Sequence, residues 1–216
     1  MRLIQRKSAS SVRSIAFFFI LNHTYHIDHP PLTIFLYVLP TETTLAVSVF
    51  GTGCPPGSVD GSIGEDGTLL ALTYVGYEAA TGPGMKVTDA RKFCNVRVGL
   101  DYPAGWSYTV AKTIIRGNVN VPKKCSAKLS ALYFFSGSSD DAQCSVTFNG
   151  PVDKRYKEET SVDTFVWSKC GVKGKEGPLF NINSDARVTC KEAAVLGVDT
   201  TDTKFELKLL LQWKKC

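Results

Sequence analysis

Histidine, the commonest catalytic and metal-binding side chain, is confined to the first thirty of the 216 residues, at His23, His26 and His29. The region after residue 50 therefore cannot form a Ser-His-Asp triad, a Cys-His pair or a histidine-ligated metal site. The His-x-x-His-x-x-His spacing could hold a metal, but no further pattern surrounds it. We expect neither a metal nor another cofactor.

Carboxylates leave one enzymatic alternative open, a polysaccharide hydrolase or lyase. Glycosidases need two carboxyl groups about 5–10 Å apart, and no local motif selects a pair, so we assign no catalytic residue. The candidates are Glu65, Asp66, Asp89, Asp101, Asp153 and Glu158. Calcium is a second option, in the Gly-rich loop 57–67 with Asp60, Glu65 and Asp66 or in the loop with Asp140-Asp141. Neither loop has the EF-hand spacing, and loop 57–67 also lacks the phosphate-loop ending.

Aromatic side chains could stack on sugar rings, and Trp106, Tyr108 and Tyr133 are the candidate ligand-binding aromatics. Trp106 follows a turn directly and is the best candidate for exposure. Tyr133, Phe134 and Phe135 are adjacent, so in a strand at least one ring faces away from a one-sided core. The same residues also suit a β core, and that alternative stays open.

The seven cysteines are widely spaced, and the closest two lie nineteen residues apart. This spacing excludes a C-x-x-C redox motif and a zinc knuckle. Such cysteines behind a secretory signal indicate disulfides formed in an oxidising compartment. The odd number leaves one thiol or an intermolecular bridge, and spacing alone does not fix the connectivity.

Two short apolar runs, residues 15–21 and 31–39, precede the cysteines. Neither reaches the roughly 18 residues of a membrane span, so we expect no stable span, and both are near the ~7–15-residue core of a secretory signal. Ala46-x-Ser48 matches a signal-peptidase site and predicts a mature start near Val49. Residues 1–48 are thus a signal segment, or an extension from a wrongly chosen start codon. An anchor formed by residues 15–21 is the alternative.

Apolar or alternating runs separated by turn residues dominate the chain, so we expect the side chains named above to lie on or between short strands. The predicted strands cover residues 69–75, 96–100, 106–110, 113–121, 129–135, 145–148, 162–167, 179–182 and 205–213. Residues 191–196 are expected to form one helical turn, and Glu158-Glu159 a solvated turn. The pattern predicts one all-β domain over residues 49–216, a disulfide-stabilised antiparallel β-sandwich or jelly roll.

The net charge of +5 comes from scattered Lys and Arg residues. They form no long basic stripe, so we do not expect nucleic-acid binding.

Ten short motifs follow one another between residue 53 and the C-terminus. They are Gly53-Cys54-Pro55, Gly82-Pro83-Gly84, Asp89-x-Arg91-x-x-Cys94, Tyr102-Pro103-x-Gly105, Arg116-Gly117, Tyr133-Phe134-Phe135-Ser136-Gly137, Gly150-Pro151, Val166-Trp167-Ser168-x-Cys170-Gly171, Asn181-Ile182-Asn183 and Trp213-x-x-Cys216. In this order they resemble the domain of unknown function 4360 family of small secreted, mostly fungal proteins. The resemblance implies secretion and a disulfide-stapled β domain, and it brings no catalytic residue.

The resemblance also implies which cysteines are shared. It pairs Cys54 with Cys94 and Cys170 with Cys216, and it leaves the unpaired thiol among Cys125, Cys144 and Cys190. We therefore expect a secreted, non-enzymatic protein that binds outside the cell, in a cell-surface or effector-like role. The expected partner is a cell-wall polysaccharide or a host surface protein.

Overall fold

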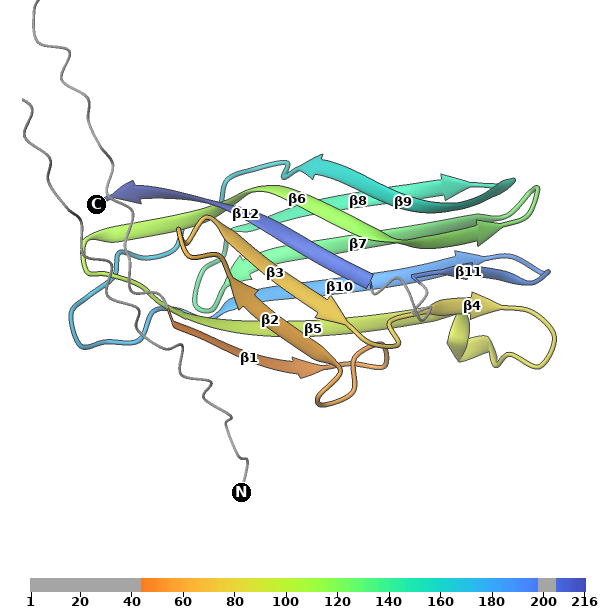
Figure 1. The fold of residues 1–216 in the computed structure, drawn as a ribbon, viewed down its shortest axis with the longest axis horizontal. Coiled ribbons are helices and arrows are strands. Elements are labelled where there is room, and N and C mark those ends of the chain that lie inside the picture. The colour runs from red at the N-terminus through yellow and green to blue at the C-terminus, as the bar shows by residue number, and fades with distance from the viewer. Residues whose placement is uncertain (1–43, 198–204) are drawn as a thin grey trace, which may run out of the picture. The chain divides into compact units, whose positions relative to one another are not determined.

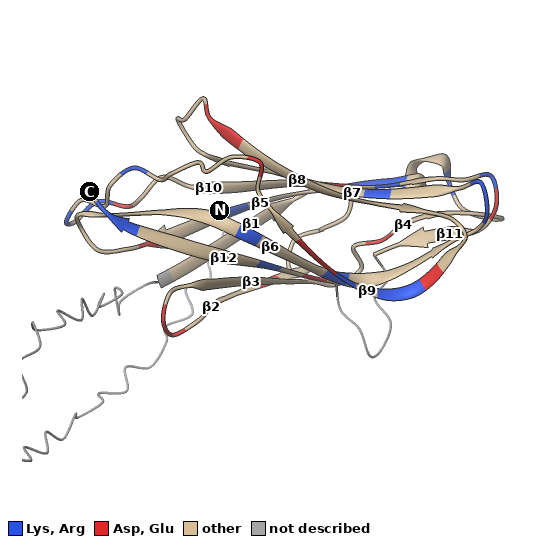
Figure 2. Ribbon diagram, turned by 90° about the horizontal axis from the view of Figure 1, so that it is seen from above, with Lys and Arg blue, Asp and Glu red and all other residues tan. Residues whose placement is uncertain are grey.

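The computed structural model describes residues 44–197 and 205–216. Within these residues, twelve strands form two antiparallel sheets, and one short 3-10 turn, η1 (Val87–Ala90), is the sole helical element. Figures 1 and 2 show the two layers from two directions. The predicted all-β sandwich is confirmed. No helix in this part of the chain is long and apolar enough to cross a membrane.

The first layer is a five-stranded sheet with the order β1-β5-β10-β7-β8. Its strands are β1 (Thr44–Phe50), β5 (Arg91–Asp101), β10 (Phe180–Thr189), β7 (Ser126–Phe135) and β8 (Asp141–Asn149). Along β5, Cys94, Val96 and Val98 are fully buried, whereas Arg97 between them is exposed. One face of this sheet therefore packs against the second layer, and the other faces solvent.

The second layer is a seven-stranded sheet with the path β2-β3-β12-β6-β11-β4, and β9 pairs with β6 outside this path. Its strands are β2 (Val59–Ile63), β3 (Leu69–Tyr74), β12 (Phe205–Lys215), β6 (Trp106–Val121), β11 (Ala194–Leu196), β4 (Ala79–Thr81) and β9 (Val152–Ser161). In β12, Phe205 and Leu207 are buried, while Glu206 and Lys208 form an ion pair at 3.2 Å. The alternation seen in the sequence thus places one face of β12 in the core.

Four segments differ from their predictions. Residues 162–167 form no strand. Asp163 accepts a hydrogen bond from the Gln143 amide of β8 at 2.9 Å, and Val166 lies beside β6, where the Thr109 hydroxyl donates to its carbonyl at 2.7 Å. Residues 191–196 lead into strand β11 rather than a helical turn, because β11 pairs with β4 and β6. The charged segment around Glu158-Glu159 lies within β9, and the predicted strands 106–110 and 113–121 are one strand, β6.

Three disulfides join loops or chain ends to one another or to strand β5: Cys54–Cys94, Cys170–Cys216 and Cys125–Cys190, with Cα–Cα distances of 5.4, 6.1 and 4.8 Å. The first two are the pairs implied by the family resemblance. Cys144 is a free, buried thiol.

Strand β1 crosses the predicted cleavage point. All seven of its residues pair with β5, and its Val47 packs so closely on Gly61 that an added Cβ there would lie 2.6 Å from Val47 Cγ2. A mature start at Val49 would remove five of the seven residues of this strand. The signal segment itself falls mostly on residues 1–43, outside the described residues, and the cleavage point stays a prediction.

Candidate functional site

Two of the three candidate ligand-binding aromatics lie in the core. Tyr108 and Tyr133 are each 1% exposed. The Tyr133 hydroxyl lies 3.1 Å from Thr113 Oγ1 and 3.3 Å from Cys144 Sγ, and burial raises the pKa of both tyrosines well above the usual value. Neither ring presents a face to solvent, so the core role that the sequence left open applies to both.

Trp106 is partly exposed, at the end of the domain that the Cys170–Cys216 bridge closes. The Lys215 ammonium lies 5.6 Å from the centroid of its ring. Trp167 has a similar arrangement, with Lys214 at 3.9 Å. These cation–π contacts occupy ring faces, so a sugar stacking there would have to displace a lysine.

The candidate carboxylates do not gather into one site. Asp89 accepts hydrogen bonds from the Lys92 ammonium and the Lys86 amide, both at 2.9 Å, and Lys92 in particular lowers the pKa of Asp89. Asp66 accepts from the Thr68 amide at 2.9 Å, which lowers its pKa. These bonds hold local turns. Among the described residues, no three His, Cys, Asp or Glu side chains lie close enough to hold a metal.

Two neighbouring rows of side chains cross the outer face of the five-stranded sheet. Each row takes one residue from each strand, in the order β1, β5, β10, β7 and β8. The first row is Ser48, Arg97, Asn181, Phe134 and Asp141. The second row is Phe50, Asn95, Asn183, Leu132 and Gln143. We call these ten residues the amide face. The sequence indicated that one ring of residues 133–135 faces outward, and that ring is Phe134, because its neighbours are buried.

The amide face combines fixed polar groups with apolar rings. Asn181 is buried, and its Nδ2 lies within hydrogen-bond distance of the Leu179 carbonyl (3.1 Å) and Ser136 Oγ (3.0 Å), which orients the amide. Phe50 is 70% exposed at the edge, with its ring centroid 6.2 Å from that of Phe93. Arg97 is exposed and forms no ion pair with any residue of the described part. This arrangement can donate and accept hydrogen bonds and offer apolar contact at once.

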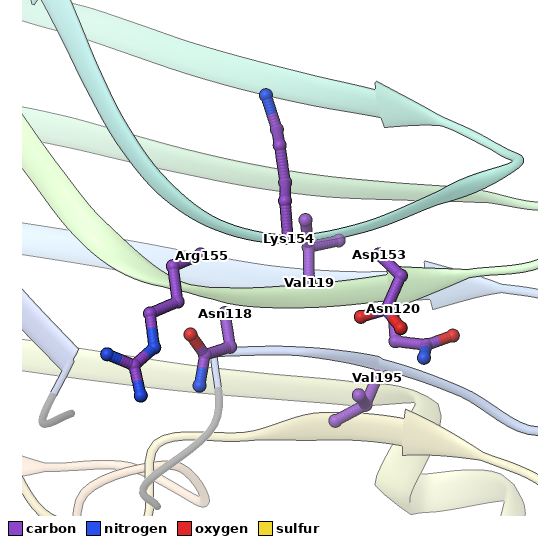
Figure 3. Close-up of a pocket in the computed structure, with 7 residues that line it drawn as sticks. All are labelled: Asn118, Val119, Asn120, Asp153, Lys154, Arg155 and Val195. Atoms are coloured by element: carbon purple, nitrogen blue, oxygen red, sulfur yellow. The ribbon is translucent and has the colours of Figure 1, made fainter. Parts of the chain in front are cut away.

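The second sheet carries a concavity of about 320 Å³ at the end where β6, β9 and β11 meet (Figure 3). Cross-strand pairing places Asn118 opposite Arg155 and Asn120 opposite Asp153, and Val195 of β11 also pairs with Asn120. We call this concavity, with these five side chains, the polar cup. Of these five residues, only Asp153 was a candidate in the sequence analysis. The alternation in Asn118-Val119-Asn120 could have indicated that the two asparagines share one face of a strand.

The fold and the three disulfides define a class, the secreted β-sandwich stabilised by disulfide bonds. The family model "Domain of unknown function (DUF4360)" matches residues 43–216, so the chain belongs to this family, as its motifs predict. A relative from Arthroderma benhamiae, named "Uncharacterized secreted protein", is 33% identical over 177 residues, covering 80% of this chain and 71% of the relative. The protein is secreted, as expected.

A solved structure of a Family 11 carbohydrate-binding module from Clostridium thermocellum, in complex with a β-1,3-1,4-mixed-linked tetrasaccharide, is also similar. The similarity covers 82% of this chain and 91% of the module, with 10% identity and a TM-score of 0.23.

Proposed function

We propose that this protein binds polysaccharide outside the cell, on the amide face. The observation that carries the proposal is the pair of aligned rows, in which Asn95, Asn183 and Gln143 stand beside the outward Phe50 and Phe134.

The chemistry of the rows suits a sugar polymer. Each amide supplies two donors and an acceptor, the set that sugar hydroxyls need. Aromatic rings offer large apolar surface to the C–H faces of the sugar. Three of the five strands of this sheet contribute an amide to the second row, namely β5, β10 and the edge strand β8. A chain lying across the strands would therefore meet amides on the adjacent β5 and β10 and again on β8.

The test uses protein secreted from the full-length gene and incubated with insoluble chitin, β-glucan and cellulose. We expect at least one polymer to deplete the protein from the supernatant without releasing reducing ends. Released reducing ends would instead support the carboxylate-based hydrolase. If no polymer depletes the protein, polysaccharide binding is wrong and a protein partner becomes the leading interpretation.

Variants locate the surface. Phe50→Ala together with Asn183→Ala should weaken binding at least about tenfold, which corresponds to about 1.4 kcal/mol. Lys157→Ala is the matched control, because Lys157 is an exposed residue of the other sheet. Retained affinity in the double variant would place binding elsewhere, with Trp106→Ala as the next variant.

A further inference from the structure

The polar cup lies on the seven-stranded sheet, away from the amide face. Its middle strand is β6, with Asn118 and Asn120, and β6 pairs along one edge with β9, which carries Asp153 and Arg155, and along the other with β11. Figure 3 shows the polar ends of Asn118 and Arg155 lying near one another, with Asp153 beside Asn120. Val195 adds an apolar contact from β11. Four hydrogen-bonding side chains and one aliphatic side chain thus surround one concavity.

The charged groups farther along the same sheet neutralise one another. Arg116 pairs with Glu206 at 3.5 Å, and both Lys112 and Lys157 pair with Glu159, at 3.3 and 2.9 Å. These ion pairs lie on the strands beside the cup, and none of them includes one of the five residues of the cup.

Inside the cup the polar groups lack such partners. Within residues 44–197 and 205–216, neither Arg155 nor Asp153 forms an ion pair or a side-chain hydrogen bond. Asn118 Oδ1 is buried and has no hydrogen-bond partner there. A buried oxygen without a donor is unfavourable, so a donor supplied by a ligand, after a small rotation of the amide, would be favourable.

Arg155 and Asp153 give the cup a net charge of zero, and this limits the class of ligand that it favours. Arg155 contributes one positive and Asp153 one negative group. Lys154 does not add to them, because its ammonium lies 3.7 Å from Glu158 and 5.8 Å from the Phe148 ring centroid, and Figure 3 shows its side chain directed away from the others. A balanced set of donors and acceptors favours an uncharged ligand with many hydroxyls over an anion or a cation.

The size of the cup limits how much ligand it can hold. About 320 Å³ is at the lower end of the ~300–1,000 Å³ range of small-molecule sites. This volume suits one or two sugar units and is too small to enclose a longer chain.

We propose that the polar cup is a second carbohydrate site, which binds one or two uncharged sugar units. In this site Arg155 and Asp153 bind neighbouring hydroxyls, and Asn118 and Asn120 complete the hydrogen bonds. The apolar edge of the sugar contacts Val195. The site is on the opposite sheet from the amide face, so loss of binding at one of these surfaces does not imply loss at the other.

The test is NMR titration of the ¹⁵N-labelled secreted protein with glucose, galactose, mannose, N-acetylglucosamine, cellobiose and laminaribiose. We expect at least one of these sugars to shift the backbone amides of residues 118–120 and 153–155 with a Kd on the order of millimolar. The shifts should not include Asn95 or Asn183, whose movement reports the amide face instead.

Variants and charged probes complete the test. Arg155→Ala should weaken the binding at least tenfold, and so should Asp153→Ala, while Lys157→Ala on the same strand should leave the affinity unchanged. Unchanged affinity in both cup variants would overturn the proposal, as would the absence of any shift at the cup. Tighter binding of inorganic phosphate or of glycine than of every sugar would also overturn it, because the ligand would then be charged.

Discussion

Strand β1 lies at the edge of the five-stranded sheet, and its removal is a direct test of the fold. A chain beginning at Val49 lacks Leu45 and Val47, which are half-buried and pack against the core. Half of a full aliphatic burial amounts to about 1 kcal/mol for each side chain. The void left against Gly61, where Val47 packs most closely, adds a cost of similar size. We expect the shortened chain to be about 2–4 kcal/mol less stable than one beginning at Thr43.

The assay is thermal and urea unfolding of the two chains, followed by circular dichroism. For a domain of this length about 1 kcal/mol corresponds to roughly 2–4 °C, so the Tm should fall by about 4–16 °C. Ser48→Ala in the longer chain is the matched control, because Ser48 faces outward, and it should change stability by less than about 0.5 kcal/mol.

Equal stability of the two chains would refute this reasoning and show that β1 is dispensable. N-terminal sequencing of the secreted protein addresses the processing itself. A start at Val49 would establish the cleavage predicted from Ala46-x-Ser48. A start at or before Thr44 would show that the strand is retained.

Three further predictions concern cysteines and pH. Replacing Cys125 and Cys190 together by Ser opens a loop with a sequence separation of 65, and urea unfolding should show a loss of about 4 kcal/mol on the chain-entropy model; an unchanged midpoint would contradict it. The free thiol of Cys144 is 7% exposed, so a thiol reagent should label almost none of it in the native protein and one thiol per chain after unfolding without reductant; rapid native labelling would argue against its burial. The bond from Lys92 lowers the pKa of Asp89 below its usual 3.8 in the folded state, so Asp89 stabilises the fold above about pH 4, and this contribution disappears as the pH falls through the folded-state pKa. Asp89→Asn should therefore flatten the acid limb of a stability–pH curve; an identical limb in the variant would refute the assignment.

Local sequence patterns correctly predicted the strands that have one face in the core and the other in solvent. In β12, Leu207 lies on the buried face and Lys208 on the opposite face. Apolar and polar residues therefore alternate along the sequence, which is the pattern that predicts a strand. The segment 162–167 carries similar residues but was wrongly predicted as a strand, because its apolar Val166 is buried by packing beside β6 rather than within the sheet.

Strand β9 shows the opposite case. Lys154, Lys157 and Glu159 are exposed along an outer strand, so no apolar face marks it in the sequence. Pairing with ten residues of β6 makes it a strand. Its role in the polar cup was therefore not visible, although Asp153 itself had been considered as a carboxylate.

Alternation, cysteine spacing and ordered motifs are properties of the linear chain, and they were enough to predict the all-β class, the secreted and disulfide-bonded character and the family. Which face of a sheet each of those residues occupies depends on the three-dimensional fold. Tyr108 and Tyr133 lie in the core because their side chains are on the inward faces of β6 and β7. Asn95 and Asn183 became neighbours because antiparallel register aligns strands that are distant in the sequence. Register arises from the packing of whole sheets, and no local pattern encodes it.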